Sequence, residues 1–347
     1  VVLTMQLLVF DPLGLPFLLN VLMTIAFVWI YTFFGGVKSI VSVDVLKTIC
    51  LVASVVLSIV FIAKGLGLDF GGVVTTIRES QMSRVFFFDD INDGRYFWKQ
   101  FLAGAFTMVA TTGLDQDMMQ RNLSCKSDTE ARRNMIVSSI FQFFVIALFL
   151  MLGVLLYTYA EQMGIQLPES SDQVFPFLAT GDFFPEIVGI LFIIGLVAAA
   201  FPAAGSALTA LTTSFTIDIL GAKEKEEKRL EKTRKWVHVG MALLMGVCII
   251  AFEILNNTSV INAVYVLSSY TYGPLLGLFT FGIFSKRRVR DRLIPIVVIL
   301  SPILCYILDS NSVEWFGGYH FSYEILIINA LFTMLGLLIC SHKAERA

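Results

Sequence analysis

Nine long apolar runs divide this chain, and they constrain its fold more than any other feature. The hydrocarbon core of a bilayer is about 30 Å thick, and a helix crosses it with about 20 residues. The nine runs lie near residues 14–34, 40–63, 97–114, 134–159, 185–220, 237–255, 260–284, 293–308 and 321–341. A porin-type barrel would instead show alternating segments of about 10 residues. The sequence therefore predicts an all-α integral membrane protein with about nine transmembrane helices.

Composition supports this class and excludes several others. Hydrophobic residues make up 56% of the chain and charged residues 15%, whereas soluble domains carry about 25% charged residues. Lys and Arg number 25 against 27 Asp and Glu, so we expect no nucleic-acid partner. The five cysteines are scattered, and no Cys or His pair has the spacing of a transition-metal site. We therefore expect no enzyme active site and no organic cofactor, and the partner that composition indicates is the lipid bilayer.

Basic residues predict the orientation of the chain in the membrane. When the nine runs alternate across a bilayer, 20 of the 25 Lys and Arg residues fall on one side. Basic loops accumulate on the cytoplasmic side, and one missed helix would destroy this asymmetry. We therefore expect a multi-pass protein of the plasma membrane, with its C-terminus in the cytoplasm and the bacterial inner membrane as the favoured location.

The segment boundaries predict one transmembrane domain over residues 1–347. The mixed-charge segment 221–236 is interpreted as a cytoplasmic linker within it. Val1 is not an initiator Met, and no basic segment precedes the apolar stretch 1–10, so a signal peptide is not expected. We interpret this stretch as the end of an earlier segment and the chain as a fragment of a longer protein.

Asp44 is a carboxylate near the cytoplasmic start of the second run. Polar groups within a bilayer are costly and therefore need an explanation. A carboxylate at a helix N-terminus with Lys47 three residues later is one explanation. A cation-binding role is the other.

The fifth run, 185–220, is far longer than a bilayer requires and contains the small-residue stretch 198–206. Pro202 lacks an N–H and frees the carbonyl four residues earlier, that of Ala198. Carbonyls exposed beside a cavity are one means by which transporters hold cations. The stretch is therefore either a kinked helix packed against its neighbours or a helix that lines a transport site.

Two further runs carry clustered polar residues. Thr111 and Thr112 precede Gly113 at the end of the third run, where they either satisfy an unwound backbone or bond back to their own helix. Residues 268–274 (SSYTYGP) are the most polar stretch inside any run, and the Gly-Pro pair predicts a local break. This favours a helix that lines a wet cavity over one that faces lipid. The histidines lie at span edges with no partner pattern, and we assign them no role.

Four stretches of the chain carry motifs that can be compared with known families. They are Gly35-Gly36 followed by Asp44, the DQDMMQR loop at 115–121, the helix from Ser206 to the TIDI ending at Asp218, and SYTYGPLLGLF at 269–279. Taken in order, they resemble the sodium:solute symporter family, which includes sodium–glucose, sodium–proline and sialic acid cotransporters. Each alone is moderately specific, but their order, spacing and membrane sides agree, and the resemblance covers the chain from about residue 14.

The resemblance implies a five-plus-five inverted-repeat transporter fold, with substrate and sodium bound at broken helices near the midplane. This chain resembles the last two helices of the first repeat, all five of the second and two additional helices. The first three core helices of the family are missing, so we expect a partial fold and an incomplete site.

The resemblance also implies a set of site residues. The substrate side would comprise Thr111, Thr112, Gln116 and Tyr270. The cation side would comprise Asp44, Ser206 and the backbone around Ala199, with Pro202 and Ala203 at the position of the family's usual sodium-binding Ser-Ser pair.

One departure from the family concerns the coupling ion. Neither Pro202 nor Ala203 has a side chain that can coordinate a cation, whereas Asp44 and Ser206 match positions that hold a second sodium in some members. Coupling to sodium, coupling to protons through Asp44, and no coupling all stay open. We expect no transition metal.

The resulting hypothesis is secondary active transport, in which a cation, with sodium favoured, drives symport of a small polar solute by alternating access. The solute would be a sugar, an amino acid or a carboxylate. Two alternatives stay open: a transporter-like membrane sensor domain, and an uncoupled facilitator or channel.

Overall fold

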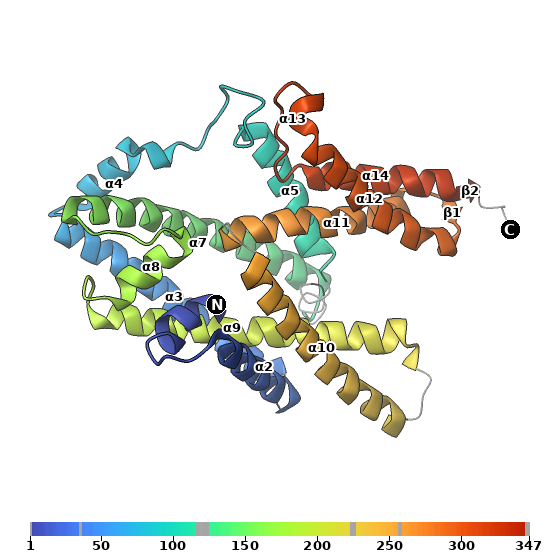
Figure 1. The fold of residues 1–347 in the computed structure, drawn as a ribbon, viewed down its shortest axis with the longest axis horizontal. Coiled ribbons are helices and arrows are strands. Elements are labelled where there is room, and N and C mark those ends of the chain that lie inside the picture. Colours follow the sequence, from blue (N-terminus) through green and yellow to red (C-terminus); the bar gives the residue numbers. More distant parts are fainter. Residues whose placement is uncertain are drawn as a thin grey trace. The chain divides into compact units, whose positions relative to one another are not determined.

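The computed structural model describes the backbone of residues 2–34, 37–115, 119, 125–222, 227–255 and 259–343 (Figure 1). The chain forms two compact units. Unit 1 comprises Val1–Ser83 and Arg132–Ser259, and unit 2 comprises Arg84–Ala131 and Val260–Ala347. The expectation of one domain over the whole chain stays a prediction.

Unit 1 is built from helices that the apolar runs predicted, with short helices between them, and α7 belongs to it from Arg132 onward. Their bounds are α1 Val2–Met5, η1 Gln6–Phe10, α2 Phe17–Phe34, α3 Val37–Gly65, α4 Phe70–Glu79, η2 Gln81–Ser83, α7 Asp128–Met163, α8 Ser171–Thr180, α9 Glu186–Ser214, η3 Phe215–Ile219 and α10 Glu227–Leu255. Pro185 precedes α9 and Glu186 lies in its first turn, where an acidic side chain favours a helix start.

Close backbone approach holds unit 1 together. A Cβ atom at Gly195 of α9 would lie 2.7 Å from Leu51 Cγ of α3, and the Ser54 hydroxyl donates to the Val188 carbonyl at 3.1 Å. Small residues of this kind let membrane helices pack closely. A second cluster of buried apolar residues joins α2, α9 and α10 through Val28, Leu208 and Ala242.

Unit 2 contains the remaining helices and one small sheet. Its elements are α5 Phe97–Gly113, α11 Val260–Phe284, β1 Arg287–Val289, η5 Asp291–Leu293, α12 Ile294–Ser310, α13 Ser312–Trp315, α14 Ile325–Cys340 and β2 Ser341–Lys343. The antiparallel pair β1–β2, with Arg288 opposite His342, was not predicted from the sequence. It is a short addition to the otherwise helical architecture.

Every one of the nine apolar runs overlaps a helix in the described part of the chain. Within the residues that the structure describes, five helices are long and apolar enough to cross a membrane by length and composition: Val45–Gly65, Asp128–Met163, Glu186–Ile219, Arg229–Ile254 and Asp291–Ser310. The helical class is therefore confirmed, while the number of spans and the inverted repeat stay predictions.

One expectation about local structure was wrong, and a second gains structural detail. The Gly273-Pro274 pair does not break its helix, because α11 continues through it from Val260 to Phe284. The charged segment 221–236 is helical from Glu227, where α10 begins, and its role as a cytoplasmic linker stays a prediction. Within it, Lys235 Nζ lies 2.7 Å from Glu231 Oε1, an (i, i+4) pair that supports the helix.

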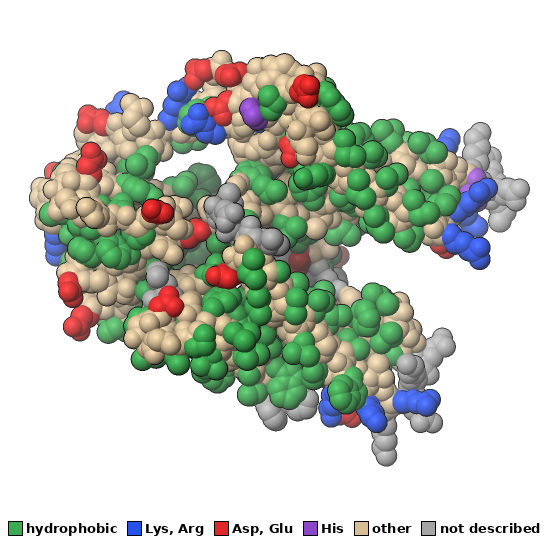
Figure 2. All heavy atoms as spheres, viewed as in Figure 1, with side chains coloured by type: hydrophobic (Ala, Val, Ile, Leu, Met, Phe, Trp, Pro, Cys, Tyr) green, Lys and Arg blue, Asp and Glu red, His purple; other side chains and the backbone are tan. Residues whose placement is uncertain are grey.

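The surfaces of both units suit a lipid environment. Figure 2 shows hydrophobic side chains over the sides of the long helices, and many large ones are more than half exposed, among them Phe143 (69%) and Val247 (62%). Basic side chains gather near the start of α10 in unit 1 and beside β1 in unit 2. This separation of apolar sides from charged ends is typical of membrane helices.

Candidate functional site

The residues predicted for a transport site are divided between the two units. Thr111, Thr112 and Tyr270 belong to unit 2, whereas the candidates on α9 belong to unit 1. Gln116 lies outside the described residues. The backbone of Asp44 lies in α3, but its side chain is outside the described part.

A side chain of α14 satisfies the backbone carbonyl that Pro274 leaves unpaired in the polar run of α11. Pro274 lacks an N–H, so the Tyr270 carbonyl loses its helical donor. The Asn329 side chain, which is fully buried, donates from Nδ2 to this carbonyl at 2.9 Å and to the Ser269 carbonyl at 3.3 Å. Because the freed carbonyl is satisfied, the helix continues past the proline.

Asn329 is held in turn by two hydroxyl groups. The Ser301 hydroxyl of α12 lies 2.5 Å from Asn329 Oδ1 and 2.8 Å from the Asn329 carbonyl. The Thr333 hydroxyl lies 2.9 Å from Ser301 Oγ. A Cβ atom at Gly273 would lie 2.5 Å from Asn329 Cβ, so the glycine permits the contact. Three helices of unit 2 therefore meet in one buried polar network.

The two tyrosines of the same run reach carboxylates. The Tyr270 hydroxyl donates to Asp309 Oδ2 of α12 at 2.8 Å, and both side chains are half-buried. The Tyr272 hydroxyl lies 3.4 Å from Asp115 Oδ2, just beyond the end of α5. This places two carboxylates beside aromatic hydroxyls, a combination of donors and acceptors that suits a polar solute or a cation.

The end of α5 supplies the other substrate-side candidates. The Thr111 hydroxyl donates to the Thr107 carbonyl of its own helix at 2.8 Å, and Thr111 and Thr112 are both half-buried. The helix ends at Gly113, as the sequence predicted. The Tyr272–Asp115 contact brings this end of α5 to the polar run of α11, whereas Tyr270 itself turns to α12.

The cation-side candidates lie on one continuous helix. In α9, Pro202 is buried, Ala199 and Ser206 are half-buried, and Ala203 is exposed. Ala198, whose carbonyl Pro202 frees, is buried. The side chains of Pro202 and Ala203 carry no oxygen, so only backbone carbonyls and Ser206 can offer a ligand along this stretch. Among the residues the structure describes, no group of three or more His, Cys, Asp or Glu is placed to hold a metal ion.

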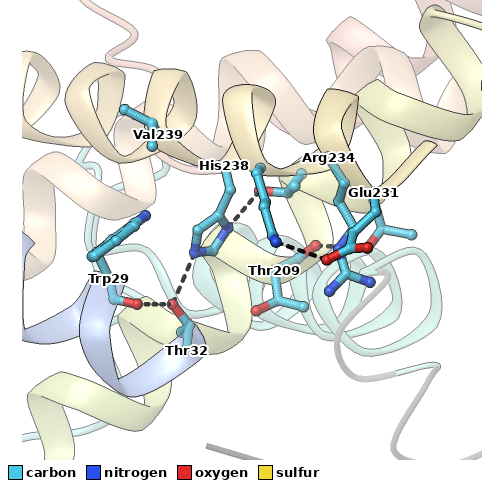
Figure 3. A pocket seen from close by; sticks show the side chains of 10 residues that line it. Trp29, Thr32, Thr209, Glu231, Arg234, His238 and Val239 are labelled. Atoms are coloured by element: carbon cyan, nitrogen blue, oxygen red, sulfur yellow. Dashed lines mark hydrogen bonds and ion pairs between the residues drawn. The ribbon is translucent and has the colours of Figure 1, made fainter. Parts of the chain in front are cut away.

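Several polar contacts were missed by sequence reasoning. Asn329 and Asp309 lie in or at the end of apolar runs, and a lone polar residue in such a run was the available signal. His238, to which no role was assigned, contacts two threonines: Nε2 lies 3.0 Å from Thr32 Oγ1, and Nδ1 lies 3.1 Å from Thr212 Oγ1 (Figure 3).

Comparison with known proteins identifies what this arrangement is similar to. The model of the sodium:solute symporter family matches residues 5–291. The sodium/sialic acid symporter NanT of Aliivibrio fischeri is 26% identical over 309 residues, which cover 85% of this chain and 58% of NanT. The human sodium-coupled monocarboxylate transporter 1 is 23% identical and is matched over 73% of this chain and 42% of its own length.

A solved structure shares the fold. It is the substrate-bound outward-open state of a Na⁺-coupled sialic acid symporter, with a TM-score of 0.76 and 19% sequence identity. The match covers 99% of this chain and 71% of that chain. This chain therefore has the fold of a large part of that protein, and it spans well under two thirds of the length of the two curated relatives.

Proposed function

Because this chain belongs to the sodium:solute symporter family, we propose that it acts as part of a secondary active transporter that couples a cation to the uptake of a small polar solute. The observation that carries this proposal is the family match over residues 5–291. The apolar helices and the polar run of α11, with Tyr270 and Tyr272 bonded to carboxylates, support it.

We propose a solute that carries a carboxylate. The names of the relatives support this class, since sialic acid and monocarboxylates both bear one. Thr111, Thr112, Gln116 and Tyr270 are the proposed substrate-side residues. Hydroxyl and amide groups can donate hydrogen bonds to a carboxylate without adding a charge to the membrane interior. To do so, Thr111 and Tyr270 would exchange their present acceptors, the Thr107 carbonyl and Asp309, for the solute. The remainder of the pocket would come from helices outside this chain.

The proposed coupling ion is sodium, bound by Asp44 and Ser206 with the backbone around Ala199. Pro202 and Ala203 have no side-chain oxygen, so Asp44, Ser206 and the backbone carbonyls would have to supply the ligands of the ion. Each charge that crosses about 100 mV contributes about 2.3 kcal/mol, which is nearly a 50-fold accumulation. The repeats would rock about the site to give alternating access, with the C-terminus in the cytoplasm.

Uptake into proteoliposomes by the full protein that contains this chain tests the proposal. A panel of radiolabelled carboxylates, amino acids and sugars is offered with a sodium gradient, and then with choline in place of sodium. We expect carboxylate uptake that requires sodium, that Asp44→Asn reduces at least 10-fold, and that the exposed loop variant Asp182→Asn leaves unchanged. Restoring serine at both 202 and 203 should steepen the sodium dependence.

The same assay separates the alternatives. Solute binding without uptake would indicate a sensor domain. Uptake that ignores both the membrane potential and every cation gradient would indicate a facilitator or channel. Sodium-driven uptake that is unchanged in Asp44→Asn would contradict the cation assignment, and a proton-driven uptake that is lost in the same variant would move the coupling from sodium to protons.

A further inference from the structure

Unit 1 contains a partly open cavity that none of the proposed transport residues lines. Its volume is about 620 Å³, and it lies where α2, α9 and α10 meet (Figure 3). A water molecule occupies about 30 Å³ in the liquid, so the cavity can hold a group much larger than one water. Residues of all three helices form its walls.

His238 connects the three helices that form these walls. His238 of α10 contacts Thr32 of α2 at 3.0 Å and Thr212 of α9 at 3.1 Å. The ring therefore joins the three helices through both of its nitrogens. A cavity whose walls are tied in this way needs little ordering when a ligand enters, which favours binding.

The α10 wall of the cavity carries a net positive charge. Lys235 Nζ lies 2.7 Å from Glu231 Oε1, so these two charges offset each other. Arg234 also lines the cavity and has no hydrogen bond or ion pair among the described residues. A guanidinium group presents five N–H donors in a planar fork that matches the oxygens of a phosphate. The wall therefore suits an anionic group of this geometry.

The α9 wall offers hydrogen-bond acceptors instead. The Thr209 hydroxyl donates to the Gly205 carbonyl at 2.8 Å, and the Thr213 hydroxyl donates to the Thr209 carbonyl at 2.8 Å. Each hydroxyl has one proton, so the two oxygens face the cavity as acceptors. A fitting ligand thus combines anionic oxygens for Arg234 with hydroxyl donors for Thr209 and Thr213.

The position of the cavity along α10 indicates where such a ligand comes from. The charged turns of α10 end at Lys235, and Trp236, 70% exposed, begins its apolar part. Leu243 and Leu244, exposed by 59% and 54%, follow on the same helix. Exposed tryptophans typically lie at the headgroup level of a bilayer. Basic pockets between membrane helices at this level bind anionic headgroups.

We propose that this cavity binds the headgroup of an anionic phospholipid that carries hydroxyl groups. Its phosphate contacts Arg234 and Lys235, its headgroup hydroxyls donate to Thr209 and Thr213, and its acyl chains lie along the apolar part of α10. The site is separate from transport and does not depend on the identity of the solute or the ion.

Native mass spectrometry of the delipidated full chain in neutral detergent tests the proposal, with phosphatidylglycerol as the probe. We expect Arg234→Gln to weaken phosphatidylglycerol binding at least about 10-fold. The matched control is Arg229→Gln, an exposed arginine of the same charged turns that does not line the cavity, and it should stay within about 2-fold of the wild type. Phosphatidylcholine should bind more weakly than phosphatidylglycerol.

A second variant tests the hydroxyl contacts without changing charge. Thr213→Val should weaken binding of phosphatidylglycerol but not of phosphatidic acid, which has no headgroup hydroxyl. Equal thermal midpoints of lipid-free wild type and variants show that they are folded. Equal losses in Arg234→Gln and Arg229→Gln would overturn the proposal. So would equal binding of phosphatidylcholine, or full displacement of the lipid by inorganic phosphate or glycerol phosphate, which would identify a soluble anion as the ligand.

Discussion

The pairing of Asn329 with the proline-freed carbonyl of α11 leads to a quantitative prediction. Asn329→Leu removes two donated hydrogen bonds, to the carbonyls of Tyr270 and Ser269, and one accepted from Ser301. Hydrogen bonds between membrane helices contribute about 0.6 kcal/mol on average and up to about 1.7. The three together predict a loss of about 2–5 kcal/mol in the free energy of unfolding.

A second substitution isolates the contribution of the proline. In Pro274→Ala, residue 274 regains an N–H that can donate to the Tyr270 carbonyl within α11. Asn329→Leu should therefore cost about 1 kcal/mol less in the Pro274→Ala background than in the wild type. The four proteins are compared by unfolding in mixed micelles with increasing SDS, followed by tryptophan fluorescence.

Asn262→Leu is the matched control, because Asn262 lies on α11 but its side chain accepts from the Tyr323 hydroxyl at 2.7 Å and has no contact with the proline site. Its cost should be the same in both backgrounds. Independent sites add within about 0.3–0.5 kcal/mol. If Asn329→Leu and Pro274→Ala also add within that margin, the carbonyl that Pro274 frees does not determine the role of Asn329.

Three further predictions follow from single contacts. Gly273→Ala should lower the free energy of unfolding by about 1–3 kcal/mol, because its Cβ would lie 2.5 Å from Asn329 Cβ. Gly282→Ala, whose Cβ would have no atom within 4 Å, should change it by almost nothing in the same SDS titration. Equal effects would contradict the packing argument. Burial, followed by the nearby Glu324 carboxylate, raises the pKa of Tyr319. The stability that this shift contributes is present below the ordinary tyrosine pKa of about 10 and is lost as pH rises towards the folded value. Ultraviolet titration should show one fewer late-ionising tyrosine in Tyr319→Phe, and an unchanged count would refute this. The Arg95 guanidinium and backbone N–H lower the pKa of Asp93 to about 2. The stability that this shift contributes is present above the ordinary aspartate pKa of about 3.9 and is lost as pH falls through about 2. During acidification, the infrared band of the labelled carboxylate should persist at pH 3 in the wild type and disappear at a higher pH in Arg95→Gln.

The class of this protein and the positions of its helices could be predicted from local sequence alone. An apolar run long enough to cross a bilayer has one stable backbone form there, since every N–H and C=O must be paired within the segment. All nine runs accordingly overlap helices. The sequence also indicated which helices carry unusual residues: small residues and a proline at 198–206, and polar residues at 268–274.

The contacts of these polar residues could not be predicted from the sequence, because packing selects hydrogen-bond partners that lie far apart in the chain. Asn329 reaches the Tyr270 carbonyl across 59 positions, and His238 reaches Thr32 across 206. The Gly-Pro pair predicted a break, yet the helix continues because a side chain from another helix replaces the missing donor.

The sequence by itself thus determined that the chain is a bundle of apolar helices and which of them carry polar groups. Only the tertiary structure decided which polar groups meet, that α11 stays continuous, and that the ends of α2, α9 and α10 border one partly open basic cavity. The physical reason is that burial in lipid is a property of each segment, whereas the satisfaction of a buried donor or acceptor depends on which helix lies beside it.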